Sequence, residues 1–330
     1  MKAKQRTLGV LLFLILLAGG VFALLTLRNA REEQAASAAA DGTIPLAAVS
    51  GNDLTQIVLH YQGETNTLFY TADGWTLAED PAYHLDTSAC NTMFTALSSL
   101  NAKRELSLQA GEDYGLDSPQ LTVTVTAAGQ STTLTFGAEN PVTGDLYVQK
   151  AGDDAIYTVS GNKAACFQLD KAGLFGSFCP TGLTASAITQ VAYTLADGTS
   201  VTLNAVSEPT ESADSTDADS ASSSAYETVW RLASDPAASL AQDKVQGLLS
   251  ALCTYATAQT TDADLAACGF DAPVFTAVVT SEDGSTVQLT YACGTDGWYL
   301  QVEGDTSVYT VDTSTVQALL LTENDLKTQE

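Results

Sequence analysis

The sequence predicts an α+β fold: two tandem repeats, each a mainly antiparallel β-sheet with packed helices, after one N-terminal transmembrane helix. Three observations predict it. The motif Gly-apolar-Asp-small-Pro occurs twice, as "GLDSP" at residues 115–119 and "GFDAP" at residues 269–273, each time ahead of a β-rich run. Further short matches recur in the same order in both halves, which indicates a duplicated structural unit. Residues 8–27 form an uncharged apolar run.

The two halves match at several points besides this motif. "DLTQI" at residues 53–57 corresponds to "AITQV" at 187–191, "LYVQ" at 146–149 to "WYLQ" at 298–301, and "IYTV" at 156–159 to "VYTV" at 308–311. Trp75 and Asp80-Pro81 correspond more weakly to Trp230 and Asp235-Pro236. The predicted organisation is a cytoplasmic tip and anchor (1–31), a linker (32–52), a first repeat (53–175), a linker (176–186) and a second repeat (187–326).

The spacing of these matches locates an insertion of 21 residues in the second repeat, before Trp230. Residues 207–225 contain five acidic residues, seven serines and no basic residue. Such low-complexity sequence cannot bury a core, so we expect a disordered loop. A calcium loop is the alternative, but the required Asp-x-Asp-x-Asp-Gly pattern with Glu at position 12 is absent.

Each repeat is expected to start with a β-hairpin. Residues 54–61 and 66–71 alternate or are rich in β-formers, Gly63 lies between them, and Trp75 opens a short third strand. Apolar residues at helical spacing then predict a helix at residues 86–100, with a counterpart at 241–255. The remaining predicted elements of the first repeat are strands at 121–126, 132–136, 146–150 and 155–159 and a closing helix at 161–169; the second repeat closes with a helix at 312–321.

The repeated motif is predicted to turn the chain from a helix end into a strand. The glycine reaches positive φ and stops the helix, the aspartate bonds nearby backbone N–H groups in an Asx turn, and the proline favours extended backbone before it. An aspartate that is duplicated with the fold and has no obvious partner is expected to be structural rather than catalytic. This structural signature comprises Gly115, Asp117, Pro119, Gly269, Asp271 and Pro273.

The uncharged run at residues 8–27 is long enough to span a bilayer, because 20 residues at about 1.5 Å each reach roughly 30 Å. Lys2, Lys4 and Arg6 precede it, which favours a cytoplasmic N-terminus. A cleaved signal peptide is the alternative, but its apolar region is usually only about 7–15 residues. We therefore expect an uncleaved membrane anchor, with the bulk of the chain outside the cytoplasm.

Charge argues against nucleic acid as a partner. The chain contains 13 basic and 39 acidic residues, and five of the basic residues precede Glu32. The remainder thus carries eight basic residues against 39 acidic ones. A body this acidic is repelled by phosphate backbones and offers no basic stripe.

Six cysteines lie in the part expected to be exported, and their even number permits disulfides. Their spacing does not resemble metal or redox motifs, and buried thiols are the alternative. We favour a bridge between Cys253 and Cys268, because Cys268 lies at a predicted helix end and Cys253 on the preceding helix. The six are Cys90, Cys166, Cys179, Cys253, Cys268 and Cys293.

No residue set predicts a reaction. The two histidines, His60 and His84, have no counterparts in the second repeat, and no His/Cys cluster supplies metal ligands. Nucleophile-elbow and phosphate-loop motifs are absent. We predict no catalytic residue, cofactor or metal. The matched aromatics, Trp75 with Trp230 and Tyr157 with Tyr309, are expected to pack in equivalent places, with a carbohydrate-stacking surface as the alternative.

The anchor, "DLTQIVL" followed by "DGW", "YGLDSPQLTVTV" and "DLYVQKAGDDAIYTV" together resemble a bacterial family known as domain of unknown function 4340. The resemblance is clearest from residue 53 to about residue 174. It implies an exported, membrane-tethered protein, and some members occur beside ABC-type export systems linked to gliding motility. It implies no catalytic residues. The cysteines and the acidic insertion are not part of the family pattern.

These observations favour a membrane-tethered extracytoplasmic binding or scaffold protein, accessory to an ABC-type transport or envelope complex. Its expected partners are the membrane, through residues 8–27, and a protein in the membrane or envelope. A cell-wall carbohydrate-binding protein is the alternative. An exported hydrolase is the third reading, and it lacks a supporting motif.

Overall fold

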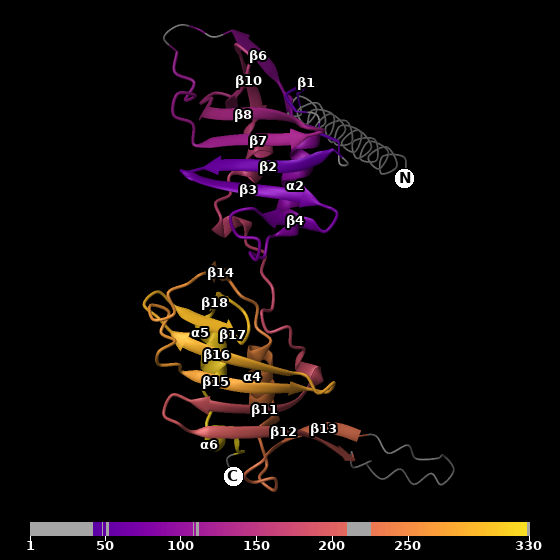
Figure 1. Cartoon of the computed structure of the whole chain (residues 1–330), viewed down its shortest axis with the longest axis vertical. Helices are drawn as coiled ribbons and strands as arrows, with labels where there is room; N and C mark the ends of the chain where they lie inside the picture. Colours follow the sequence, from indigo (N-terminus) through magenta and orange to yellow (C-terminus); the bar gives the residue numbers. More distant parts are fainter. Residues whose placement is uncertain are drawn as a thin grey trace, which may run out of the picture. The chain divides into compact units, whose positions relative to one another are not determined.

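The computed structural model describes residues 42–47, 49–50, 53–107, 109, 112–209 and 226–328. The predicted anchor at residues 8–27 and most of the predicted acidic loop lie outside this part. No helix within it is long and apolar enough to cross a membrane. The described residues form two compact units (Figure 1): those up to Glu79 together with those of Thr87–Leu174, and Asp80–Asp86 together with those from Phe175 onward.

The first unit contains an eight-stranded sheet in which every neighbouring pair is antiparallel. Its helix α2 (Thr87–Ser98) lies across one face of this sheet, and α3 (Gly161–Ala164) follows the strand β10. A separate small sheet pairs β1 (Ile44–Pro45) with β5 (Asn101–Ala102). In sheet order the eight strands are β4 (Gly74–Leu77), β3 (Glu64–Thr71), β2 (Leu54–Tyr61), β7 (Leu121–Ala127), β8 (Gln130–Glu139), β9 (Asp145–Lys150), β10 (Ala155–Ser160) and β6 (Arg104–Ser107).

The second unit repeats this topology strand for strand, and all its pairs are antiparallel. Its helices are α4 (Gln242–Leu252), α5 (Thr313–Leu319) and α6 (Glu323–Leu326). In sheet order the strands are β13 (Tyr226–Leu232), β12 (Ser200–Pro209), β11 (Ile188–Leu195), β15 (Phe275–Ser281), β16 (Thr286–Cys293), β17 (Trp298–Val302), β18 (Ser307–Val311) and β14 (Ala258–Thr261). The predicted tandem repeat of antiparallel sheets is confirmed at this level, with fewer helices than strands among the described residues.

Alternation along the strands decides which face of each sheet is buried. In β7, Leu121, Val123 and Val125 are buried, whereas the threonines between them are half-exposed. The helix completes the core because its apolar residues recur at helical spacing: Cys90, Met93 and Leu97 of α2 are fully buried. Leu248 and Leu252 of α4 are equally buried in the second unit.

The insertion extends one hairpin of the second unit. The hairpin of β3 and β4 turns after the pair Thr71–Gly74, whereas β12 and β13 continue pairing as far as Pro209–Tyr226. Residues 207–209, predicted as part of a loop, belong to β12 for this reason. Residues 210–225 lie outside the described part.

Segment Asp80–Asp86 follows the first hairpin in sequence but packs with the second unit. The Gln259 carboxamide on the edge strand β14 accepts a hydrogen bond from His84 N (2.8 Å) and donates one to Ala82 O (3.0 Å). Thr261 Oγ1 donates to Asp80 Oδ2 at 2.6 Å. The segment therefore contacts the edge strand β14 through the side chains of Gln259 and Thr261.

Candidate binding groove in the first unit

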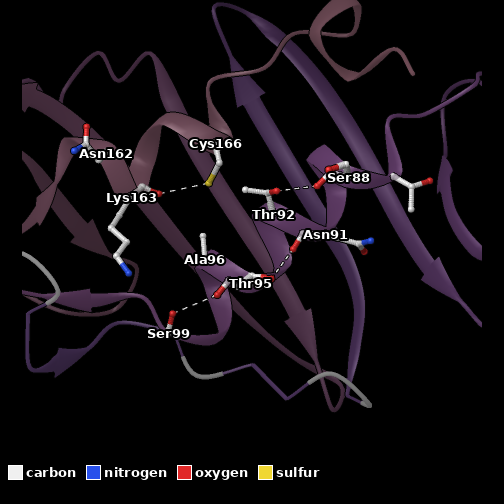
Figure 2. Close-up of a pocket in the computed structure, with 10 residues that line it drawn as sticks. Ser88, Asn91, Thr92, Thr95, Ala96, Ser99, Asn162, Lys163 and Cys166 are labelled. Atoms are coloured by element: carbon white, nitrogen blue, oxygen red, sulfur yellow. Dashed lines mark hydrogen bonds between the residues drawn. The ribbon is translucent and has the colours of Figure 1, made fainter. Parts of the chain in front are cut away.

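A groove of about 690 Å³ runs between α2 and α3 in the first unit (Figure 2). The side chains of α2 line it along one side, and those of α3 and the turn after it line the other. No carboxylate belongs to its lining, although the chain has 39 acidic residues. The lining residues are Thr87, Ser88, Asn91, Thr92, Thr95, Ala96, Ser99, Asn162, Lys163 and Cys166.

Helix α2 provides this surface because its 12 residues, "TSACNTMFTALS", include no charge. Its hydroxyl groups donate to the backbone of the same helix: Thr92 Oγ1 to Ser88 O at 2.8 Å, Thr95 Oγ1 to Asn91 O at 2.8 Å, and Ser99 Oγ to Thr95 O at 3.3 Å. Each hydroxyl proton is thereby used inside the helix. The hydroxyl oxygens that face the groove consequently serve a ligand mainly as acceptors.

An aromatic pair flanks the groove at Asn91. Trp75 Nε1 donates to Asn91 Oδ1 at 2.9 Å, so the amide nitrogen of Asn91 is left as a donor. The rings of Trp75 and Tyr70 lie 4.8 Å apart, and Tyr70 is 39% exposed. The counterpart Trp230 is only 2% exposed. The two matched tryptophans thus occupy corresponding strands but different surroundings.

The opposite side of the groove contains one cation and one thiol. Cys166 Sγ donates to Lys163 O at 3.5 Å, and burial raises the pKa of the Cys166 thiol to about 11. The thiol is therefore neutral at physiological pH, which makes it a poor nucleophile. With no carboxylate or histidine in the lining, the groove offers hydrogen bonds, apolar contact and the cation of Lys163.

The corresponding helices of the second unit are held together. Thr254, just after α4, and Thr315 of α5 form a hydroxyl–hydroxyl bond of 3.0 Å. Their counterparts by strand order and spacing are Ser99 and Lys163, which line the groove instead. The same two elements are thus joined in one unit and leave a groove in the other.

A family model described as a domain of unknown function (DUF4340) matches residues 75–229 and residues 230–330. The chain belongs to the DUF4340 family. The resemblance in the sequence motifs is thereby confirmed, and the two matched segments begin at the corresponding residues Trp75 and Trp230. None of the curated proteins and none of the solved structures matches the chain.

The signature glycines of this DUF4340 protein lie in close backbone contacts. Gly115 has φ of +69° and Gly269 has φ of +84°. A Cβ on Gly115 would come 2.6 Å from Ala138 N, and one on Gly269 would come 2.2 Å from Cys293 O. Real Cβ atoms essentially never come so close to other atoms. Each glycine therefore lets the backbone of the corner approach the end of a neighbouring strand closely. Gly115 approaches β8, and Gly269 approaches β16. Before Gly269 the chain forms a helical turn, in which Cys268 N donates to Asp264 O at 3.0 Å and Phe270 N donates to Leu265 O at 3.0 Å.

The prediction of Asx turns at Asp117 and Asp271 is wrong. Both side chains are exposed and make no hydrogen bond among the described residues. Aspartates ahead of each glycine bond the backbone instead: Asp113 Oδ1 accepts from Gly115 N at 2.8 Å, and Asp264 Oδ1 accepts from Ala266 N at 3.1 Å. The prolines that complete the signature, Pro119 and Pro273, come two residues before β7 and β15.

The thiols of the DUF4340 protein do not pair as expected. Cys253 and Cys268 are both free in this structure. The charge of Cys179 raises the pKa of Cys253, after the larger effect of burial, whereas Cys268 lies beside Asp264 and Asp296. The expected bridge is not formed in this structure, where a helix and the corner after it put the two cysteines in different surroundings; Cys179 is free as well.

The two histidines belong to different units. His60 Nδ1 shares a 2.9 Å hydrogen bond with Thr65 Oγ1 in the first unit, and His84 stacks on Phe178 at 3.9 Å in the second. Within the part of the chain that the structure describes, no three His, Cys, Asp or Glu side chains are placed to hold a metal ion.

Proposed function

We propose that this DUF4340 protein is a membrane-tethered extracytoplasmic binding and scaffold protein, which holds a partner protein in the groove between α2 and α3. The observation that carries the proposal is the contrast between the duplicated units. In the second unit, a bond between Thr254 and Thr315 joins the end of α4 to α5. The corresponding elements of the first unit leave a groove of about 690 Å³ between them. Divergence at this place is expected when one copy of a duplicated unit acquires a ligand and the other keeps its packing.

The chemistry of the groove fits a neutral segment of a partner. The net charge of −26 repels acidic proteins and attracts basic ones over the whole surface, but the groove itself lacks carboxylates. Charged residues are depleted at the centres of protein interfaces, because a charge that loses water without a partner costs free energy. A partner with a neutral centre and a basic rim satisfies both features.

The tether rests on the sequence and on the family resemblance. The uncharged run at residues 8–27 is the proposed anchor, and the resemblance implies export and proximity to ABC-type transport systems. An anchored binding unit keeps its partner at a high local concentration, which strengthens weak contacts without new ones. This arrangement supports an accessory role in a membrane transport or envelope complex.

A matched pair of substitutions tests the proposal. Thr95→Arg places a bulky cation in the groove, and Ser250→Arg places the same side chain at the corresponding exposed position of α4. In pull-downs of the full chain from detergent-solubilised membranes, we expect Thr95→Arg to lower partner recovery about tenfold or more, the effect of roughly 1.4 kcal/mol. Ser250→Arg should recover the partner as the unchanged protein does. Equal recovery with both variants would show that the groove holds no partner.

The carbohydrate alternative is favoured by one observation, the partly exposed Tyr70–Trp75 pair beside a groove of hydroxyl and amide groups. Sugar rings stack on such aromatic faces, and their hydroxyls need both donors and acceptors. Titrating soluble N-acetylglucosamine oligomers against the full chain, with tryptophan fluorescence as the readout, tests it. Binding that Trp75→Ala removes would support this function over the protein partner, and an unchanged spectrum up to millimolar oligomer would exclude it.

A further inference from the structure

Two half-buried thiols of the second unit lie at the same end of α4. Cys179 belongs to the segment that leads from Phe175 into β11, and Cys253 is the residue that ends α4, with its N–H donating to Ser250 O at 3.2 Å. The two cysteines are 74 positions apart in sequence. Neither has a counterpart cysteine in the first unit, so the duplicated fold does not require them.

The hydroxyl of Thr181 connects the two sites. Cys179 Sγ lies 3.1 Å from Thr181 Oγ1, and the same oxygen donates to Leu252 O at 3.0 Å. The thiol of Cys179 is therefore within about 6 Å of the carbonyl oxygen of the residue that precedes Cys253.

The two thiols also share one buried neighbour. The Tyr291 hydroxyl is buried and has no hydrogen-bond partner among the described residues, and the charges of both Cys179 and Cys253 act on it. Cys253 packs against the apolar core of the unit. Cys179 and Cys253 therefore both lie near the buried Tyr291 side chain, and Cys253 does so at the border of the apolar core.

We propose that Cys179 and Cys253 form a disulfide bond, which joins the segment before β11 to the C-terminal end of α4. As the S–S bond forms, the two thiols give up two protons and two electrons. A donor disulfide, that of oxidised glutathione or of a thiol oxidoreductase, takes them up as its own S–S bond breaks to give two thiols. The inference is independent of the groove and of the partner proposed for it.

Formation of the disulfide breaks few of the hydrogen bonds that hold this part of the fold. The contact of Cys179 Sγ with Thr181 Oγ1 is lost, but Thr181 keeps its bonds to Leu252 O and to Leu183 N. In return, the cross-link restricts a long loop of the unfolded chain, and such restriction favours the folded state more as the loop lengthens. We expect the oxidised protein to unfold at a temperature higher by on the order of 10 °C.

The test uses the full chain in detergent, oxidised with a glutathione redox buffer, alkylated to trap free thiols and digested without reduction. Mass spectrometry should find one linked pair of peptides that contains Cys179 and Cys253 and that disappears on reduction. Cys268→Ser is the control and should keep the pair, whereas Cys179→Ser should lose it. The unfolding temperature of the unchanged chain is measured before and after oxidation, so the result does not depend on how well a variant folds.

Two outcomes would overturn the proposal. One is full alkylation of both thiols after oxidation to equilibrium. The other is a linked peptide that joins Cys253 to a different cysteine, for example to Cys268.

Discussion

Gly269 illustrates how a single residue type fixes a corner of this fold. Its φ of +84° is unfavourable for a residue with a Cβ, and the space that a Cβ would need is filled by the carbonyl of Cys293. Gly284 shares the positive φ, +80°, but nothing lies within 4 Å of its hypothetical Cβ. The two glycines therefore separate the cost of backbone conformation from the cost of a steric clash.

Gly284→Ala is expected to lower the free energy of unfolding by about 1 kcal/mol, the cost of a Cβ at positive φ. Gly269→Ala should cost about 2 kcal/mol more, because the strand end that contains Cys293 has to move as well. Urea unfolding of the two variants measures the difference. Equal losses would mean that the strand end at Cys293 moves without a cost in free energy. The close backbone approach would then not be the reason for glycine at position 269.

The pair of Asp153 and Tyr157 makes stability depend on pH. Tyr157 donates from its hydroxyl to Asp153 Oδ2 at 2.6 Å, and Ala155 N donates to Asp153 Oδ1 at 3.0 Å. These bonds, that of Tyr157 foremost, hold the pKa of Asp153 below its ordinary value of 3.8. Because the pKa is lowered on folding, the stabilisation is present above pH 3.8 and is lost as the pH falls through the lowered value.

Asp153→Asn should therefore lower the unfolding temperature most between about pH 5 and 7, and the difference from the unchanged chain should shrink in strong acid. Thermal unfolding from about pH 2 to 7 measures this. The exposed neighbour Asp154 supplies the control variant, Asp154→Asn, for which we expect a smaller difference. A difference for Asp153→Asn that stays constant across the pH range would contradict the assignment.

Among the elements, the edge strand β14 depends on one buried side chain. The carboxamide of Gln259 bonds His84 N, Ala82 O and Ser307 Oγ, and its side chain is 7% exposed. Gln259→Leu leaves these groups unpaired, which should cost about 2–3 kcal/mol. Gln288→Leu makes the same change on the exposed face of β16 and should cost under about 0.5 kcal/mol.

Urea unfolding compares the stabilities of the two variants. Hydrogen exchange at the amide of His84 reports on the contact between segment Asp80–Asp86 and β14. We expect that amide to exchange faster in Gln259→Leu than in Gln288→Leu. An unchanged exchange rate at His84 would show that segment Asp80–Asp86 stays on the edge without Gln259.

Elements with strong periodicity could be predicted from the sequence, and short edge strands could not. Strand β2 has the predicted bounds, residues 54–61, because its buried residues alternate with polar ones. Strands β6, "RELS", and β14, "AQTT", were not predicted, because four residues show no clear period and their pairing partners are more than 40 residues away. The placement of Asp80–Asp86 in the second unit depends on contacts as distant as that of Ala82 with Gln259.

At the scale of the whole molecule, the sequence shows the duplication and the inserted segment, but it does not show the groove. Matched motifs predicted two units of one topology, because residues such as Gly115 and Gly269 meet the same backbone requirement in both. The groove could not be predicted, because Ser99 and Lys163 look no different in sequence from ordinary surface residues. Its openness depends on whether two helices meet, which Thr254 and Thr315 achieve in the other unit.

The proposed location of the whole chain rests on residues 8–27. If this run is an uncleaved anchor, mass spectrometry of membrane fractions should detect a peptide that spans residues 31–41 with no new N-terminus. Leu16→Arg, near the centre of the run, should move a large fraction of the chain out of the alkali-resistant membrane pellet, since a central arginine costs about 3 kcal/mol in insertion. Ser186→Arg, an exposed change far from the run, is the control and should leave the pellet unchanged. A mature N-terminus near Ala40 would instead establish a cleaved signal peptide, and the scaffold function would then need another means of reaching the membrane.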